Sequence, residues 1–270
     1  MKFQIYVIFH RTLHKDFYET IPEEMFRKNI TCIGVNEKIP KSYDPWFESS
    51  VIQESQLENY NPLLQEKNYY ESSAYIHIAN SKIIDPYDYV GCLHYDMKIT
   101  NNTLKHIQTS IDSSTNCLFY FDLGIGDVNI YNSFEQPFDL AESSLMSGMS
   151  GMTGMSGMSG IVIWGEIIVS YNSLFKTSFT ISDILYGENT IPMFHSFIMP
   201  KHVLLSLEPF IASVSELILQ LLEDKRTFPY HLERLWGICL ILKKLEGVIP
   251  TWIKLTGIIH DESVKDAKNF

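Results

Sequence analysis

The chain has 270 residues, of which 45% are apolar, and a formal net charge of −11. This length predicts one large domain, and this apolar content is enough to bury a core, which excludes a chain that is disordered throughout. The densest basic pairs, Lys225-Arg226 and Lys243-Lys244, are each flanked by acids. We therefore expect no nucleic-acid partner, because a duplex binder needs a basic stripe to displace counterions from the phosphates.

The cysteines and the first residues bear on the cellular compartment. No two cysteines have CxxC spacing and their neighbours are apolar, which predicts buried free thiols in a reducing compartment. The N-terminus lacks a long apolar segment with a small-residue cleavage site, and no run reaches about 18 apolar residues. We therefore expect a cytoplasmic protein with no signal peptide and no transmembrane segment. The four cysteines are Cys32, Cys92, Cys117 and Cys239.

The first part of the chain alternates short apolar runs with helical segments, which is typical of an α/β domain. Residues 3–9 (FQIYVIF) and 31–35 (TCIGV) predict buried strands, because they are short and rich in β-branched and aromatic residues. Residues 17–28 between them predict a helical or irregular connection. The polar segment 41–62, which contains prolines, predicts a loop, and residues 63–80 predict a helix.

Four later runs have the character of strands. Residues 89–99 (YVGCLHYDMKI) begin as an apolar strand and turn polar at His94. Residues 117–123, 161–169 and 191–199 are short apolar runs and predict three further strands. Strands that alternate with helices favour a sheet whose strands are mostly parallel.

Helical spacing of apolar residues recurs in three places. Residues 104–113 predict one helix, and residues 201–223 and 231–244 predict two longer amphipathic helices. The last two make up a helical C-terminal part at about residues 201–245. The polar tail that follows residue 261 is expected to fray.

One segment, residues 146–160, has low complexity and consists of Met-Ser-Gly and Met-Thr-Gly triplets. Glycine at every third position without proline does not make a collagen-like triple helix. Glycine also leaves the backbone free to take many conformations. We therefore expect a flexible surface loop within a single domain that spans residues 1–270.

The strongest local signal for chemistry is His94-Tyr95-Asp96. A strand that ends in polar side chains is where open α/β sheets place their sites. Asp96 offers the hard oxygen ligands that Mn²⁺ or Mg²⁺ prefers, with His94 as the second ligand, and such a metal would bridge the phosphates of a nucleoside diphosphate. The alternative is an aspartate that caps a turn at the end of a strand.

Four segments follow one another in an order that is moderately specific as a combination. They are residues 68–75 (NYYESSAY), 89–95 (YVGCLHY), 193–201 (MFHSFIMPK) and 230–237 (YHLERLWG). Together they resemble the DUF4422-like group of bacterial and viral glycosyltransferase-type proteins. That group pairs an E-(L/S)-(T/S)-A-x-Y helix with a Y-I-G-L-x-H-Y-R strand. The resemblance covers roughly residues 1–245, in patches.

The resemblance implies a GT-A-like fold, which is an α/β, Rossmann-type sandwich with a central mixed, mostly parallel sheet and C-terminal helices. It also implies a nucleotide-sugar donor, a glycan or other hydroxyl acceptor and a divalent metal, Mn²⁺ or Mg²⁺. A viral member would act in the host cytoplasm. Asp96 stands where the group usually has arginine, so either a cationic side chain or a metal would meet the donor phosphates. The triplet repeat lies in the half that shapes the acceptor side, so the acceptor does not follow from the resemblance.

The resemblance further assigns residues to the donor site. The end of the first strand should meet the nucleotide, and two residues one helical turn apart should line the sugar pocket. The alternatives are a solvent-exposed histidine at a strand end and a surface glutamate beside a core tyrosine. The implied residues are His10, Arg11, Asn36, Glu71, Tyr75 and Tyr95.

Two residues of the second half complete the predicted site. GT-A enzymes often complete the metal shell with a histidine from the C-terminal half, which makes His195 a candidate ligand beside His94 and Asp96. A core histidine with satisfied hydrogen bonds is the alternative. Asp122, near the end of a predicted strand, is the candidate general base for an inverting transfer, whereas a retaining transfer needs no such base.

These observations predict a glycosyltransferase that moves a sugar from a nucleoside-diphosphate donor to a hydroxyl acceptor with the help of a metal. A non-catalytic GT-A-like module that binds glycans or a protein, and a metal-dependent hydrolase, are the alternatives. The GxSxG, P-loop and HExxH motifs of other enzyme classes do not occur in the chain.

Overall fold

The computed structural model describes residues 1–114, 116–121, 160–185, 192, 195–222 and 225–261. Three features that the sequence singles out lie outside the described residues. They are Asp122, the candidate general base, the Met-Ser-Gly triplets at 146–159 and the polar tail at 262–270.

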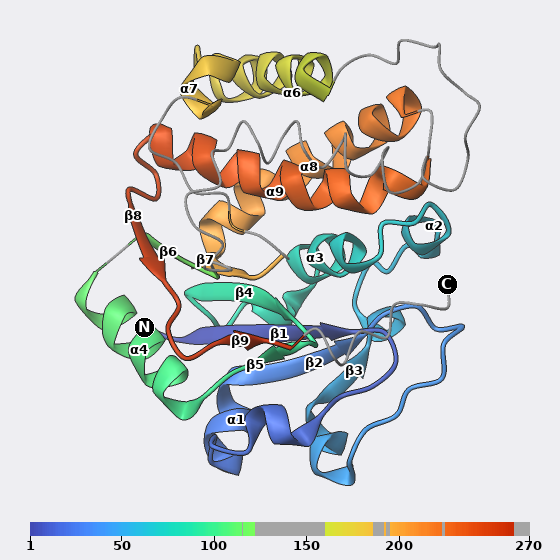
Figure 1. Ribbon diagram of the computed structural model, residues 1–270, viewed down its shortest axis with the longest axis vertical. Coiled ribbons are helices and arrows are strands. Elements are labelled where there is room, and N and C mark those ends of the chain that lie inside the picture. Colours follow the sequence, from blue (N-terminus) through green and yellow to red (C-terminus); the bar gives the residue numbers. More distant parts are fainter. Residues whose placement is uncertain (115, 122–159, 186–191, 193–194, 223–224, 262–270) are drawn as a thin grey trace.

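A seven-stranded sheet in the order β3-β2-β1-β4-β7-β6-β8 forms the centre of the protein (Figure 1). In the described sheet, β7 pairs antiparallel with both of its neighbours and the other pairings are parallel. This confirms the predicted α/β fold with a mixed, mostly parallel sheet. The strands are β1 (Phe3–Phe9), β2 (Ile30–Gly34), β3 (Val51–Gln53), β4 (Tyr89–His94), β6 (Cys117–Tyr120), β7 (Phe197–Pro200) and β8 (Thr251–Lys254).

Helices cover both faces of the sheet (Figure 1). On one face lie α3, α8 and α9, with α6 and α7 stacked outside them, and on the other face lie α1 and α4. The α-helices are α1 (Glu23–Asn29), α2 (Pro62–Glu66), α3 (Glu71–Ala79), α4 (Asn101–Ser113), α6 (Gly160–Phe175), α7 (Ile181–Leu185), α8 (Lys201–Leu221) and α9 (Phe228–Leu245). Short 3₁₀ helices span Lys15–Tyr18, Pro45–Ser50, Glu54–Gln56, Lys82–Ile84 and Lys225–Thr227.

The central strand β1 shows why the sheet is buried on both faces. All seven of its residues are buried. Tyr6 and Ile8 belong to the core beneath α3, α8 and α9, whereas Ile5, Val7 and Phe9 belong to the core on the α1 and α4 side. A strand covered on both faces needs apolar side chains at every position, which is why this run lacks the alternation of a half-exposed strand.

The strand order reverses between β1 and β4. From β1 the chain builds outward through β2 to β3, and β4 then joins the opposite side of β1. In open α/β sheets, ligands bind outside the carboxyl ends of the strands at such a switch point. The end of β1 and the end of β4 are therefore the place where this fold favours a site.

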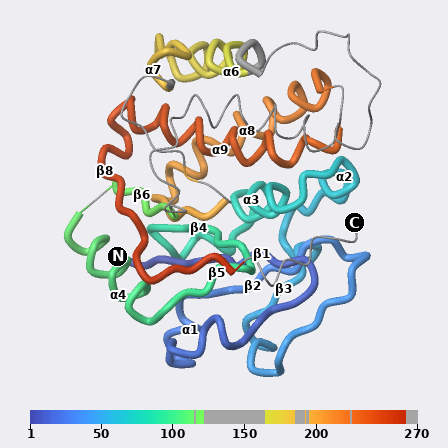
Figure 2. Tube along the Cα trace, in the orientation of Figure 1, coloured from blue at the N-terminus to red at the C-terminus, as the bar shows by residue number. Residues whose placement is uncertain are grey.

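The C-terminal segment returns to the same part of the molecule. After β8 the chain runs back past α4 (Figure 2), and β9 (Ile259–His260) pairs antiparallel with β5 (Met97–Lys98). The sequence did not predict β3, β8 or β9, and the single run predicted at residues 89–99 is divided into β4 and β5. The strands β3, β5, β8 and β9 are only two to four residues long, and a short run carries almost no periodicity.

Two predicted strands are wrong in whole or in part. Residues 161–169 lie in the helix α6, and strand structure in the 191–199 run begins only at Phe197. An apolar run without polar interruptions does not distinguish a buried strand from a helix. The predicted helix 63–80 is instead two helices, α2 and α3, because Asn68 and Tyr70 between them have φ of 62° and 46°.

The cysteines and the long helix α8 concern the prediction of a reducing compartment and no transmembrane segment. All four cysteines are free and buried, as predicted. Among the described residues, the helix α8 is long and apolar enough to cross a membrane, but half of that stretch is buried within the protein. We read α8 as a core helix, because Val203, Leu207 and Ile211 pack into the main core.

Gly91 supports a close approach of β4 to β7, which yields a stability prediction. A Cβ at this position would lie 2.4 Å from the Phe197 carbonyl oxygen and 2.5 Å from the Ile198 Cα. Backbone atoms cannot swing aside, so we expect Gly91→Ala to lower the free energy of unfolding by about 1–3 kcal/mol. Chemical denaturation measures this value. Gly165→Ala is the matched control, since nothing lies within 4 Å of its added Cβ, and a Gly91→Ala protein as stable as wild type would contradict the prediction.

Candidate functional site

Polar side chains meet where β1 and β4 end. His10 follows β1 directly, and His94 is the last residue of β4, opposite Ile8 in the strand register. Glu71, the first residue of α3, lies between the two histidines. Its Oε1 is 2.6 Å from His10 Nε2 and 3.0 Å from His94 Nε2. One carboxylate oxygen thus joins the two strand ends at the switch point.

Asp96 extends this chain of contacts on the other side of His94. Its Oδ1 is 3.2 Å from His94 Nδ1, and its Oδ2 is 3.1 Å from His260 Nε2. We call these five side chains the His–carboxylate cluster: His10, Glu71, His94, Asp96 and His260. The structure therefore brings together four of the predicted site residues and adds His260, which belongs to the unpredicted strand β9.

The cluster is closed at its ends and partly open in the middle. The side chains of His10, Asp96 and His260 are 4–6% exposed, whereas those of Glu71 and His94 are 15% and 20% exposed. Glu71 and His94 are thus the most exposed members of the cluster.

The charges in the cluster stabilise one another. Burial alone would lower the pKa of His94, but the Glu71 and Asp96 carboxylates raise it to about 10. Burial alone would raise the pKa of Glu71, but His10 and His94 hold it well below its usual range. The pKa of Asp96 is likewise lowered, against the effect of burial, by His94 and His260. The site therefore holds an imidazolium between two carboxylates near neutral pH.

This arrangement predicts an unusual titration of His94. The pKa of His94 is raised above the ordinary value of about 6.5, so its pairing contributes stability fully below that pH and loses it as pH rises through about 10. We expect NMR of the imidazole carbon-bound protons to show His94 still protonated at a pH of about 8.

Glu71→Gln provides the comparison, because it removes the largest favourable charge on His94. We expect the His94 pKa to fall toward the ordinary histidine range in that variant. A wild-type His94 that titrates like an exposed histidine would contradict the cluster.

His195 does not lie beside Asp96. Its Nε2 is 2.8 Å from the Ser72 hydroxyl oxygen, its side chain is buried, and burial lowers its pKa to about 4. The Tyr75 hydroxyl donates to the His195 carbonyl oxygen, and Tyr75 is itself buried in the main core. His195 and Tyr75 thus form an uncharged, buried layer beneath the N-terminal turn of α3. Both residues fit the alternative given in the sequence analysis, in which they belong to the core.

The remaining predicted donor-site residues lie around the ends of β1 and β2. The Tyr95 backbone N–H donates to the Ile8 carbonyl oxygen at 3.1 Å, and its buried ring packs edge-on against His10. Arg11 is exposed directly after His10. Asn36, with φ of 60°, follows β2, and its carbonyl oxygen accepts from Lys41 Nζ at 2.8 Å. Their role in binding stays a prediction.

Two residues next to the cluster have strained backbones. Tyr70 caps α3 with φ of 46° and ψ of −122°, and His195 has φ of 47°. Residues with a side chain rarely adopt such angles, and they cluster at functional sites, where the surrounding structure enforces them. Tyr70 immediately precedes Glu71, and its ring packs 6.1 Å from that of His10. The strain thus lies where the chain turns to present Glu71.

His94 and Asp96, two of the predicted metal ligands, are hydrogen-bonded to each other. Both ring nitrogens of His94 face carboxylates, and both Asp96 oxygens face histidines. Within the described ranges, no group of three or more His, Cys, Asp or Glu side chains is arranged to hold a metal ion. In this arrangement, the residues do not form a ready ligand set. The predicted Mn²⁺ or Mg²⁺ stays a prediction.

No family model matches the chain, and no curated protein sequence does. Membership in the DUF4422-like group therefore also stays a prediction. One solved structure that it resembles is the apo form of WbbM, described as a bifunctional glycosyltransferase, with a TM-score of 0.52 and 12% sequence identity. The match covers 97% of this chain and 46% of that one, so the chain spans less than half the length of this neighbour. At this identity the likeness shows the fold alone, an α/β fold with a mixed, mostly parallel sheet.

Proposed function

We propose that the protein is a glycosyltransferase that moves a sugar from a nucleoside-diphosphate donor to a hydroxyl acceptor. The observation that carries the proposal is the placement of the His–carboxylate cluster. His10 and His94 lie at the carboxyl ends of β1 and β4, where the strand order reverses. The likeness in fold to WbbM, described as a bifunctional glycosyltransferase, extends over 97% of the chain and supports the proposal.

The chemistry of the cluster suits a diphosphate leaving group. In the transfer, the acceptor oxygen forms a bond to the anomeric carbon, the bond from that carbon to the diphosphate oxygen breaks, and the nucleoside diphosphate leaves with the electron pair. The raised pKa of His94 keeps a positive charge at the ends of β1 and β4, where it would stabilise the negative charge that develops on a leaving diphosphate. A divalent cation, if it binds at Asp96, would further neutralise the leaving group.

Each other member of the cluster has a positioning role in this proposal. Glu71 fixes the orientation of His10 and His94, and Asp96 fixes the second nitrogen of His94. His260 brings the C-terminal segment onto Asp96. The proton of the acceptor hydroxyl needs a base for an inverting transfer, and Asp122 stays the candidate for that role.

Thermal denaturation with UDP, GDP and their sugars, each with and without Mn²⁺, tests the donor site. A ligand at about 100 times its dissociation constant adds roughly 2.7 kcal/mol, which shifts the midpoint of a chain of this size by about 5–10 °C. We expect such a shift with one nucleotide, lost in Asp96→Asn because that change weakens the support of His94. Asp112→Asn, an exposed carboxylate on α4, is the matched control and should keep the shift.

Further measurements distinguish a transferase from a hydrolase and from a non-catalytic binding module. Release of the nucleoside diphosphate that depends on an added hydroxyl acceptor supports the transferase, whereas release without an acceptor indicates a hydrolase. His260 contacts Asp96, whereas His195 contacts Ser72. A thermal shift that requires Mn²⁺ and disappears in His260→Ala but not in His195→Ala would therefore support a cation bound at Asp96. The absence of any nucleotide shift would contradict the proposal and favour a non-catalytic binding module.

A further inference from the structure

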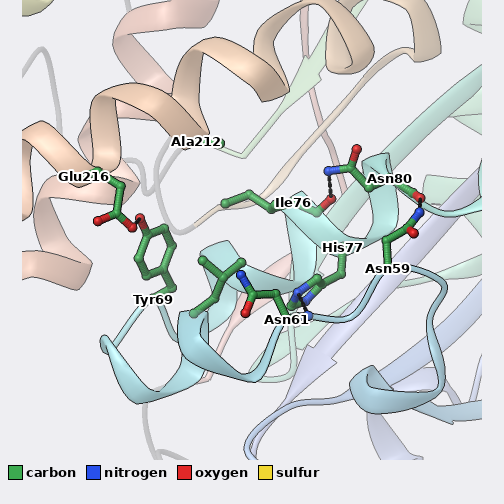
Figure 3. A pocket seen from close by; sticks show the side chains of 9 residues that line it. Asn59, Asn61, Tyr69, Ile76, His77, Asn80, Ala212 and Glu216 are labelled. Atoms are coloured by element: carbon green, nitrogen blue, oxygen red, sulfur yellow. Dashed lines mark hydrogen bonds between the residues drawn. The ribbon is translucent and has the colours of Figure 1, made fainter.

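A cavity lies on the far part of α3, away from the His–carboxylate cluster. It has a volume of about 260 Å³ and lies between α3, α8 and the segment that leads into α2 (Figure 3). Glu71 belongs to the first turn of α3, whereas His77 and Asn80 line this cavity at the other end of the helix. Six residues from Glu71 to His77 correspond to a rise of about 9 Å along the axis. The two sites therefore share one helix and do not overlap.

Three asparagines give the cavity its hydrogen-bonding capacity. The Asn59 amide nitrogen donates to the Asn80 carbonyl oxygen at 2.8 Å, which fixes that wall. The Asn80 amide nitrogen donates to the Ile76 carbonyl oxygen and to Glu208, and Asn61 Oδ1 accepts from the Leu63 backbone. Among the described residues, no protein partner bonds the Asn59 and Asn80 side-chain oxygens or the Asn61 amide nitrogen, and all three asparagines are exposed, so these groups are open to solvent. Two acceptors and one donor therefore remain for a ligand.

The cavity offers no uncompensated charge. Glu216 is held by Lys67 Nζ at 2.7 and 2.8 Å and also accepts from the Tyr69 hydroxyl. His77 Nε2 accepts from the Asn61 backbone N–H at 2.9 Å, so this nitrogen carries no proton, and its Nδ1 faces Glu54 at 2.8 Å. A neutral ligand suits these walls better than an anion, a metal ion or a zwitterion.

An apolar wall faces the asparagines. Ile76 of α3 and Ala212 of α8 line it, and Figure 3 shows Tyr69 and Glu216 on the opposite side from Asn59 and Asn80. A cavity with apolar walls and a few convergent polar groups is the usual form of a small-molecule site. Pockets for drug-sized ligands have about 300–1,000 Å³, so this one takes a smaller molecule, about one sugar ring.

We propose that this cavity is a second saccharide-binding site, which holds one neutral pyranose unit. The hydroxyls of the ring would pair with the Asn59 and Asn80 oxygens and the Asn61 amide, and its C–H face would pack on Ile76 and Ala212. The proposal goes beyond the transferase function and does not depend on it, because binding here requires neither nucleotide nor turnover.

Protein-observed NMR with D-glucose, D-galactose, D-mannose and N-acetyl-D-glucosamine, each without nucleotide, tests the site. We expect at least one pyranose to bind with a dissociation constant of about 1 mM and to shift the backbone amide signals of Asn61, Asn80 and Ala212. Mannitol, which has the hydroxyls but no ring, should bind at least about tenfold more weakly.

Substitutions on α8 give a matched pair. Ala212→Trp fills the cavity and should abolish binding, whereas Ser213→Trp adds the same side chain at the exposed neighbouring position and should leave it unchanged. Asn61→Ala should weaken binding about tenfold through the lost amide donor. Far-UV circular dichroism and denaturation midpoints check that each variant folds.

The outcomes keep this proposal separate from the transferase function. Asp96→Asn should keep pyranose binding at the cavity even if it loses nucleotide binding. Failure of every pyranose to perturb the wild-type spectrum would overturn the second site, and so would unchanged binding in Ala212→Trp.

Discussion

The Glu71 carboxylate is the contact on which the arrangement of the site depends. One of its oxygens faces both His10 and His94, which lie at the ends of two strands that are far apart in the sequence and adjacent in the sheet. A buried carboxylate is stable only when it is paired, and so is a protonated imidazole. Each group thus makes the charge of the other tolerable, and the pairing ties α3 to the end of the sheet at the switch point.

The rest of the fold holds that contact in place. β1 is buried along its length and β4 is buried up to Leu93, so the positions at which they end are fixed by the core rather than by the loops that follow. α3 is buried almost throughout, and its first turn begins at the strained residue Tyr70. Side chains on rigid elements hold their geometry more closely than side chains on loops. Tyr70 and His195 have φ angles that their own backbones disfavour, so the surrounding structure must hold them in this geometry.

The sequence predicted much of this arrangement, and its errors have physical causes. The strands β1, β2 and β4 and the helices α8 and α9 followed from their composition and spacing, and His94 and Asp96 followed from their place at a strand end. The run 161–169 was predicted as a strand but is helical, because an apolar run has no period that distinguishes the two. His195 was predicted beside Asp96, but it lies beneath α3 on Ser72.

By itself, the sequence determined the α/β class, the buried free cysteines and which strand ends carry polar side chains, because these depend on residues that are neighbours along the chain. Only the tertiary structure decided that Glu71 joins His10 to His94 and that His260, rather than His195, reaches Asp96. It also decided that Asn59, Asn61 and Asn80 line one cavity with α8. Such contacts link residues that are distant in sequence, and they depend on strand order, helix docking and the path of the C-terminal segment, which no local pattern encodes.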